Sequence, residues 1–74
     1  MDRSAVIVDT RGGADWLTLN RPERLNAITP SMANELADYF EAAKSSTSVR
    51  VVVIRGSGRG FCAGLDIKAF RARR

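Results

Sequence analysis

The chain has 74 residues, with twelve Lys or Arg, eight Asp or Glu, one Cys and no His. That length allows one domain or part of one, which excludes a complete dehydrogenase, kinase or hydrolase barrel. Without histidine there is no Ser-His-Asp or Cys-His pair and no imidazole ligand, and one cysteine makes neither an internal disulfide nor a thiolate cage. We therefore predict no metal site.

The sequence carries no sign of a membrane span. Its longest apolar run, 51–54, is far shorter than the ~20 residues that a transmembrane helix needs. The first residues lack the basic-then-apolar pattern of a signal peptide, and a lone cysteine suits a reducing compartment. We expect a cytoplasmic protein. A chain this small buries little apolar surface, which favours reliance on other copies or on further sequence.

The net charge of +4 lies at the C-terminal end. After the last acidic residue, Asp66, come only basic charges: Lys68, Arg71, Arg73 and Arg74. A basic segment can attract nucleic acid or an acidic membrane. Cations also stabilise the C-terminal end of a helix, and few aromatic residues lie nearby. We favour the helix end and expect no nucleic-acid partner.

The first half of the chain predicts a β-hairpin followed by a loop. Residues 5–8 and 16–20 are rich in β-branched and apolar residues, and they flank a Gly-Gly turn region at 9–15. Pro22 disfavours helix just before it, so residues 21–28 are expected to form a loop.

A helix is predicted from Pro30 to Lys44. Thr29 is a suitable N-cap, and Pro30 suits the first helical position. Apolar side chains then recur at helical spacing, at Met32, Leu36, Phe40 and Ala43. The helix should end in the serine-rich segment 45–48.

The second half predicts a buried strand, a glycine-rich turn and a further helix. Residues 49–55 are apolar on both faces over their inner stretch, as in a parallel strand covered on both sides. The turn at 56–60 leads through 61–65 into the helix, with Asp66 near its N-terminus as a capping residue. The order is β-β-α-β-turn-α, which indicates the α/β class.

The glycine-rich turn allows more than one function. Residues 58–63 fit G-x-G-x-x-A, a dinucleotide fingerprint. That fingerprint belongs to the first βα turn of a sheet, whereas a hairpin and a helix come first here. The amide groups that begin the helix could instead hold an anion or a developing oxyanion. A tight turn without a ligand is the third possibility.

Two sequence blocks point to a known family. Residues 19–28 fit L-N-R-P-x-x-x-N-A-[LI], and residues 56–67 fit G-x-G-x-x-F-C-A-G-x-D-[LI]. The blocks, their order and their separation resemble the enoyl-CoA hydratase/isomerase (crotonase) superfamily. The resemblance implies that residues 1–74 form the N-terminal part of a crotonase-like spiral, which is incomplete here. It also implies action on acyl-CoA thioesters, with coenzyme A present as part of the substrate and no other cofactor.

The resemblance assigns roles to particular residues. The backbone N–H of Leu65 matches one half of the family's oxyanion hole, and a helix N-terminus suits negative charge on an enolate oxygen. The positions that match the coenzyme A site are Arg24, Ala27, Ala63, Gly64, Leu65, Asp66 and Ile67. Cys62 has no base to activate it, so we expect it to pack rather than react.

The reaction implied by the family is the addition of water to a 2-enoyl-CoA through a stabilised enolate. The family's acid/base carboxylates and its second oxyanion donor belong to later segments. Glu23, Glu35 and Glu41 are no substitutes, because they lie on the first loop and the helix, away from the blocks that hold those acids. We therefore expect the 74-residue chain alone to be inactive. The alternative is a non-catalytic crotonase remnant that serves as an assembly or binding module. In either case we expect homo-oligomers or association with further crotonase sequence.

Overall fold

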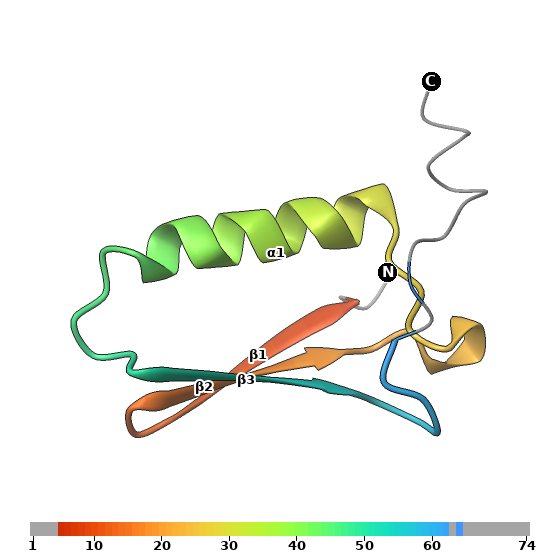
Figure 1. Ribbon diagram of the computed structural model, residues 1–74, viewed down its shortest axis with the longest axis horizontal. Coiled ribbons are helices and arrows are strands. Elements are labelled where there is room, and N and C mark those ends of the chain that lie inside the picture. The colour runs from red at the N-terminus through yellow and green to blue at the C-terminus, as the bar shows by residue number, and fades with distance from the viewer. Residues whose placement is uncertain (1–4, 63, 65–74) are drawn as a thin grey trace.

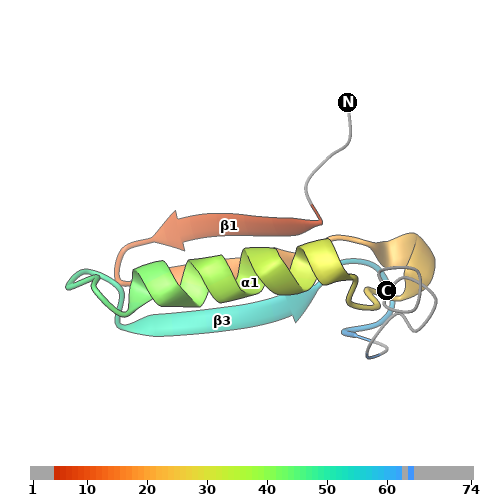
Figure 2. The same ribbon diagram turned by 90° about the horizontal axis from the view of Figure 1, so that it is seen from above.

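The structure is a computed structural model that describes residues 5–62 and residue 64. It contains β1 (Val6–Arg11), β2 (Ala14–Leu19), the short 3-10 helix η1 (Pro22–Arg24), α1 (Pro30–Ala43) and β3 (Val51–Gly56). The strands form one sheet in the order β1-β2-β3, with β1 antiparallel and β3 parallel to β2. The helix α1 lies along one face of this sheet (Figures 1 and 2).

This arrangement confirms the predicted order of hairpin, helix and parallel strand. The helix expected after residue 65 lies outside the described residues. No helix in the described part of the chain is long and apolar enough to cross a membrane.

The hairpin turn is shorter than expected. Only Gly12 and Gly13 separate β1 from β2, with Gly12 at a φ of 62°. The prediction of a turn over residues 9–15 is therefore wrong, and Asp15 lies within β2. A two-residue turn with a positive φ matches the twist of the paired strands, so no longer connection is needed. Asp15 is tolerated in the strand because the Thr10 side chain donates a hydrogen bond to its carboxylate over 2.7 Å.

The helix α1 begins as predicted and ends one residue earlier, at Ala43. The Thr29 hydroxyl accepts a hydrogen bond from the Met32 amide over 3.2 Å, which makes Thr29 the N-cap. Met32 is fully buried and packs with Val6 and Leu19 in the core between helix and sheet. This core stabilises α1 against the strands, as the helical spacing of its apolar residues predicted.

The strand β3 begins at Val51 rather than at residue 49, and its expected burial on both faces is not found. It forms an edge of the sheet, and among the described elements α1 covers one face only (Figure 1). Val51 is 55% exposed and Ile54 is 40% exposed. The apolar pattern of residues 49–55 showed that both sides of the strand are apolar. It could not show which element would pack on each side.

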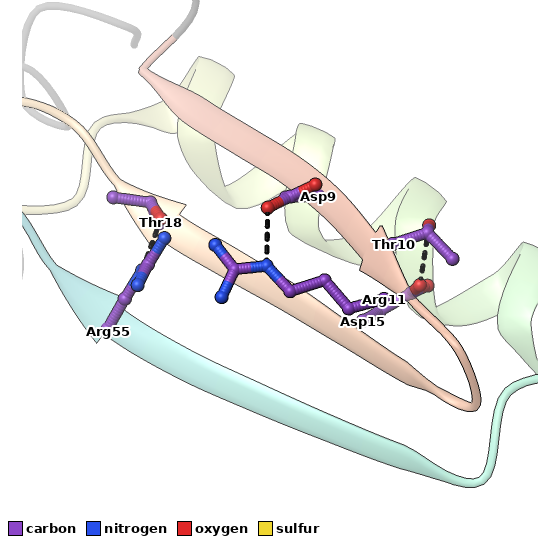
Figure 3. A network of polar contacts seen from close by, with 6 residues as sticks. All are labelled: Asp9, Thr10, Arg11, Asp15, Thr18 and Arg55. Atoms are coloured by element: carbon purple, nitrogen blue, oxygen red, sulfur yellow. Dashed lines mark hydrogen bonds and ion pairs between the residues drawn. The ribbon is translucent and has the colours of Figure 1, made fainter.

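The sheet face opposite α1 carries an aromatic ring with two cations. The guanidinium carbons of Arg11 and Arg55 lie 5.0 Å and 5.1 Å from the ring centroid of Trp16. Arg11 also pairs with Asp9, and Arg55 donates to Thr18 over 2.9 Å (Figure 3). Trp16 is thus a packing residue of the sheet surface, held by cation–π contacts.

Candidate functional site

The two motif blocks meet at the carboxyl ends of β2 and β3. Leu19 and Gly56, the last residues of these parallel strands, are partners in the register. Just beyond them, the Ser57 amide donates to the Leu19 carbonyl over 2.9 Å, and the Ser57 hydroxyl donates to Asn20 Oδ1 over 3.0 Å. The loop after β2 therefore lies beside the turn after β3 (Figure 1). Ligand sites of α/β sheets occur at this end of the strands.

Asn26 joins the two blocks through its side chain. The residue is completely buried, and Nδ2 donates to the carbonyl oxygens of Ser57, Gly60 and Phe61 over 2.9, 2.8 and 3.0 Å. Its Oδ1 accepts from the Arg21 amide over 2.8 Å. An amide has only two N–H donors, so one proton is shared between carbonyls. The carboxamide thereby fixes the shape of the glycine-rich turn.

This role of Asn26 was not predicted from the sequence. The available signal was its place in a loop between Pro22 and the helix, since asparagine adopts positive φ more readily than most residues. Leu25 and Asn26 have φ values of 52° and 58°, and the Asn26 amide donates to the Arg21 carbonyl over 2.9 Å. These bonds turn the loop back on itself and aim the Asn26 side chain at the turn after β3.

The first glycine of the second block stands where a side chain has no room. A β-carbon at Gly56 would lie 2.3 Å from the Phe61 carbonyl oxygen and 2.7 Å from Asn26 Nδ2. A β-carbon at Gly58 would lie 2.7 Å from Pro22 Cβ, and Gly58 has a φ of 80°. Contact between the two blocks therefore accounts for glycine at positions 56 and 58.

The structure brings two of the expected coenzyme A residues together. The Ile28 amide donates to the Gly64 carbonyl over 2.7 Å, which places Ala27 beside Gly64. Arg24 is exposed on η1, and its carbonyl accepts from the Ala27 amide over 3.0 Å. The other expected site residues lie outside the described residues: Ala63, Leu65, Asp66 and Ile67.

Cys62 packs, as predicted. It is partly buried against the core cluster of Val6, Leu19 and Met32. Its sulfur also accepts a hydrogen bond from the Gly64 amide over 3.4 Å. The thiol therefore helps to hold the end of the turn against the core.

Few acidic groups of the described chain belong to this junction. Glu23 lies on η1, within the loop after β2, while Glu35 and Glu41 belong to α1. Asp15 is near the start of β2, at the opposite end of that strand from Leu19. Residues 5–62 and 64 form no pocket and gather no group of three or more residues able to hold a metal ion. At the junction the described residues supply backbone N–H and C=O groups together with the neutral side chains of Asn20, Asn26 and Ser57.

Sequence comparison decides the family. A family model described as enoyl-CoA hydratase/isomerase matches residues 14–74, which include both motif blocks. The chain belongs to this family. The resemblance seen in the two blocks is thereby confirmed, and the family acts on coenzyme A thioesters.

Individual members of this family are similar to the chain in sequence and in fold. The chain is 47% identical over 58 residues to the probable peroxisomal enoyl-CoA hydratase 1 of Arabidopsis thaliana, covering 78% of this chain and 22% of that protein. It is 39% identical over 70 residues to the 3-hydroxyisobutyryl-CoA hydrolase-like protein 5 of the same plant, covering 95% and 18%. A probable enoyl-CoA hydratase/isomerase from Mycobacterium abscessus superposes with a TM-score of 0.89 at 34% identity, covering 96% and 28%.

The chain thus spans about a fifth of the length of these two plant relatives. The agreement in fold confirms an incomplete α/β unit equivalent to the N-terminal part of a crotonase.

Proposed function

We propose that this chain is part of an enzyme that adds water to 2-enoyl-CoA thioesters. Water would add across the C2=C3 bond: the hydroxyl group bonds to C3, a proton bonds to C2, and the electron pair rests on the thioester oxygen in the intervening enolate. The backbone N–H of Leu65 would donate a hydrogen bond to that oxygen. Support comes from the family and from relatives named as enoyl-CoA hydratases.

The observation that carries the proposal is the 2.7 Å hydrogen bond from the Ile28 amide to the Gly64 carbonyl. In a trans peptide group the C=O and the following N–H point in opposite directions. A Gly64 carbonyl held on Ile28 would therefore direct the next amide, that of Leu65, away from the first loop. An amide directed in this way is available to a ligand oxygen.

The first loop would supply part of the coenzyme A site. Ala27 lies beside Gly64, and a small side chain allows close approach to the main chain. Arg24 is exposed one turn earlier, where its guanidinium could meet a phosphate of the substrate. We propose that the backbone around Ala63, Leu65, Asp66 and Ile67 completes this contact, with coenzyme A entering as part of the substrate and no separate cofactor.

The acid and base for water addition would come from other sequence. Glu35 and Glu41 lie on α1 rather than on the two segments that meet, and Glu23 occupies a position of the first block where the motif accepts any residue. Loss of a single oxyanion donor alone lowers rates by about 10²–10³-fold. We therefore propose that the 74-residue chain binds and polarises a thioester without hydrating it.

Association with other copies, or with further crotonase sequence, forms part of the proposal. Val8, Val51 and Phe61 are 47%, 55% and 57% exposed, although each is apolar. Each of these side chains would gain apolar burial in a contact with another chain or segment. We place the assembled enzyme in the cytoplasm, as the sequence predicts.

The proposal is tested with crotonyl-CoA labelled with ¹³C at the thioester carbonyl. Hydrogen bonding to the oxygen weakens the C=O bond, so the labelled stretch should move to lower frequency when the chain binds. Absorbance of the enoyl group should stay constant, because no water is added. A carbonyl stretch at the frequency of free crotonyl-CoA under saturating chain would refute the oxyanion role and favour a non-catalytic binding or assembly module. Rapid hydration by the 74-residue species would refute the claim that the acids lie elsewhere.

A further inference from the structure

The shape of the glycine-rich turn is set by a side chain from the other motif block. Ser57, Gly60 and Phe61 present their carbonyl oxygens to one point, and the Asn26 amide occupies that point. Asn26 is the most deeply buried polar residue among those the structure describes, with no exposed surface. Without the Asn26 amide, the three partly buried carbonyl oxygens would face one another with no donor between them.

We propose that Asn26 is a positioning residue for the thioester site. Its amide holds the turn in the form that carries the Gly64 carbonyl to the Ile28 amide, and through that bond it orients the peptide group that begins at Gly64. The inference rests on the proposed function, because the orientation of that peptide group affects the chemistry only if a thioester carbonyl binds there and is polarised.

The short spacing along both segments supports this coupling. Ile28 lies two residues after Asn26, and Gly64 lies three residues after Phe61. The segments are thus bonded at Asn26–Phe61 and again at Ile28–Gly64, over 3.0 and 2.7 Å. An extended chain spans only ~3.5 Å per residue, so two or three residues leave little slack between these bonds. Loss of the first bond should loosen the second.

The most direct variant is Asn26→Asp. It keeps the size of the side chain but replaces the donating NH₂ group by a second oxygen, which then faces three carbonyl oxygens. Asn20→Asp is the matched control, because it introduces the same charge in the same loop. The Oδ1 of Asn20 accepts from the Ser57 hydroxyl over 3.0 Å, and an aspartate keeps that acceptor.

The first measurement is hydrogen exchange at the Ile28 amide, followed by NMR in the 74-residue chain. We expect exchange about tenfold faster or more in Asn26→Asp, as loss of a buried donor implies. Asn20→Asp should retain the wild-type rate, and the amides that pair β1 with β2 should keep theirs in both variants. An unchanged Ile28 rate in Asn26→Asp would overturn the proposal.

The second measurement is the ¹³C=O stretch of bound crotonyl-CoA, compared at saturation so that weaker binding does not affect it. The low-frequency shift of the wild type should be lost in Asn26→Asp and kept in Asn20→Asp. A shift in the wild type that persists in Asn26→Asp would overturn the positioning role. If the wild type gives no shift while its Ile28 amide stays protected, the proposed function fails instead.

A second, uncharged variant separates positioning from folding. Asn26→Ala removes the donors without adding charge, and its circular dichroism reports whether the sheet and helix persist. We expect both Asn26 variants to keep that signal while the Ile28 amide loses protection. If both variants unfold the whole chain, Asn26 stabilises the fold as a whole rather than orienting the turn at the thioester site, and the proposal is wrong.

Discussion

The hydroxyl group of Tyr39 on α1 donates a hydrogen bond to the carboxylate of Asp15 on β2. This bond crosses from helix to sheet near the hairpin, and the Thr10 hydroxyl donates to the other oxygen of the same carboxylate. The Tyr39 bond, followed by the Thr10 bond, holds the pKa of Asp15 below its usual value of 3.8. Bonding to Asp15, with burial as a smaller cause, raises the pKa of Tyr39 to about 12.

These two shifts predict a pH dependence of stability. The lowered pKa of Asp15 gives stability that is complete above pH 3.8 and is lost as the pH falls through the folded-state value. The raised pKa of Tyr39 gives stability that is complete below pH 10 and is lost as the pH rises toward about 12. Urea unfolding across pH should show that Tyr39→Phe is less stable than wild type between these limits, with the difference shrinking at both extremes.

A second variant separates the two limbs of this profile. Thr10→Val removes a bond to Asp15 but leaves the Tyr39 hydroxyl in place. It should change the acid limb and leave the alkaline limb as in wild type. A constant difference between Tyr39→Phe and wild type from acid to alkaline pH would contradict the link between the bond and the titration.

Crowding at Gly56 predicts that alanine cannot replace it. The added methyl would lie 2.3 Å from the Phe61 carbonyl oxygen, so the turn would have to open. We expect Gly56→Ala to lower the free energy of unfolding by about 1–3 kcal/mol, as overpacking does. Gly60→Ala is the control, because its added methyl would lie 3.6 Å from Leu25 Cδ2, an ordinary contact. Urea unfolding of both variants checks this, and equal losses would contradict the crowding argument.

Burial of Met32 predicts a large effect of truncation. The side chain is fully buried between α1 and the sheet. Met32→Ala should cost about 2–5 kcal/mol, enough to unfold a small chain. Val51→Ala also shortens an apolar side chain, but one that is mostly exposed, so it should cost less than about 1 kcal/mol. Circular dichroism during urea titration would refute the assigned core if the two losses were alike.

The N-cap of α1 gives a smaller prediction. Thr29→Ala removes the hydroxyl that accepts from the Met32 amide, and it should cost about 1 kcal/mol. Thr47→Ala removes the same hydroxyl at an exposed position after the helix, and it should have little effect. The test is the difference in thermal unfolding midpoint between the two variants. A midpoint for Thr29→Ala no lower than that for Thr47→Ala would show that the cap does not stabilise the helix.

Local chemistry made the elements predictable from the sequence. Thr29 and Pro30 mark the start of α1 by capping and by a preset φ, and these effects act within one turn of helix. The apolar run of β3 predicted a strand, and its parallel pairing with β2 is confirmed. The turn before Asp15 was predicted too long, because Asp15 is stabilised in β2 by Tyr39, which is distant in sequence.

The candidate site depends on longer-range contacts, so its geometry could not be read from the sequence. The motif blocks named the loop and the turn, but not the bonds between Asn26 and the carbonyls of the turn. Those partners are separated by more than thirty residues and meet only because β2 and β3 end side by side. The predicted oxyanion donor, Leu65, lies outside the described residues and stays a prediction.

The cation–π contacts of Trp16 make this side chain an optical probe. It is the chain's single tryptophan, so all indole emission comes from one known position on the sheet surface opposite α1. Anything that settles on that surface, whether a second subunit or additional polypeptide, would displace water from around the ring and its two guanidinium neighbours. The wavelength of the emission maximum and the emission intensity would then report docking directly, without a label.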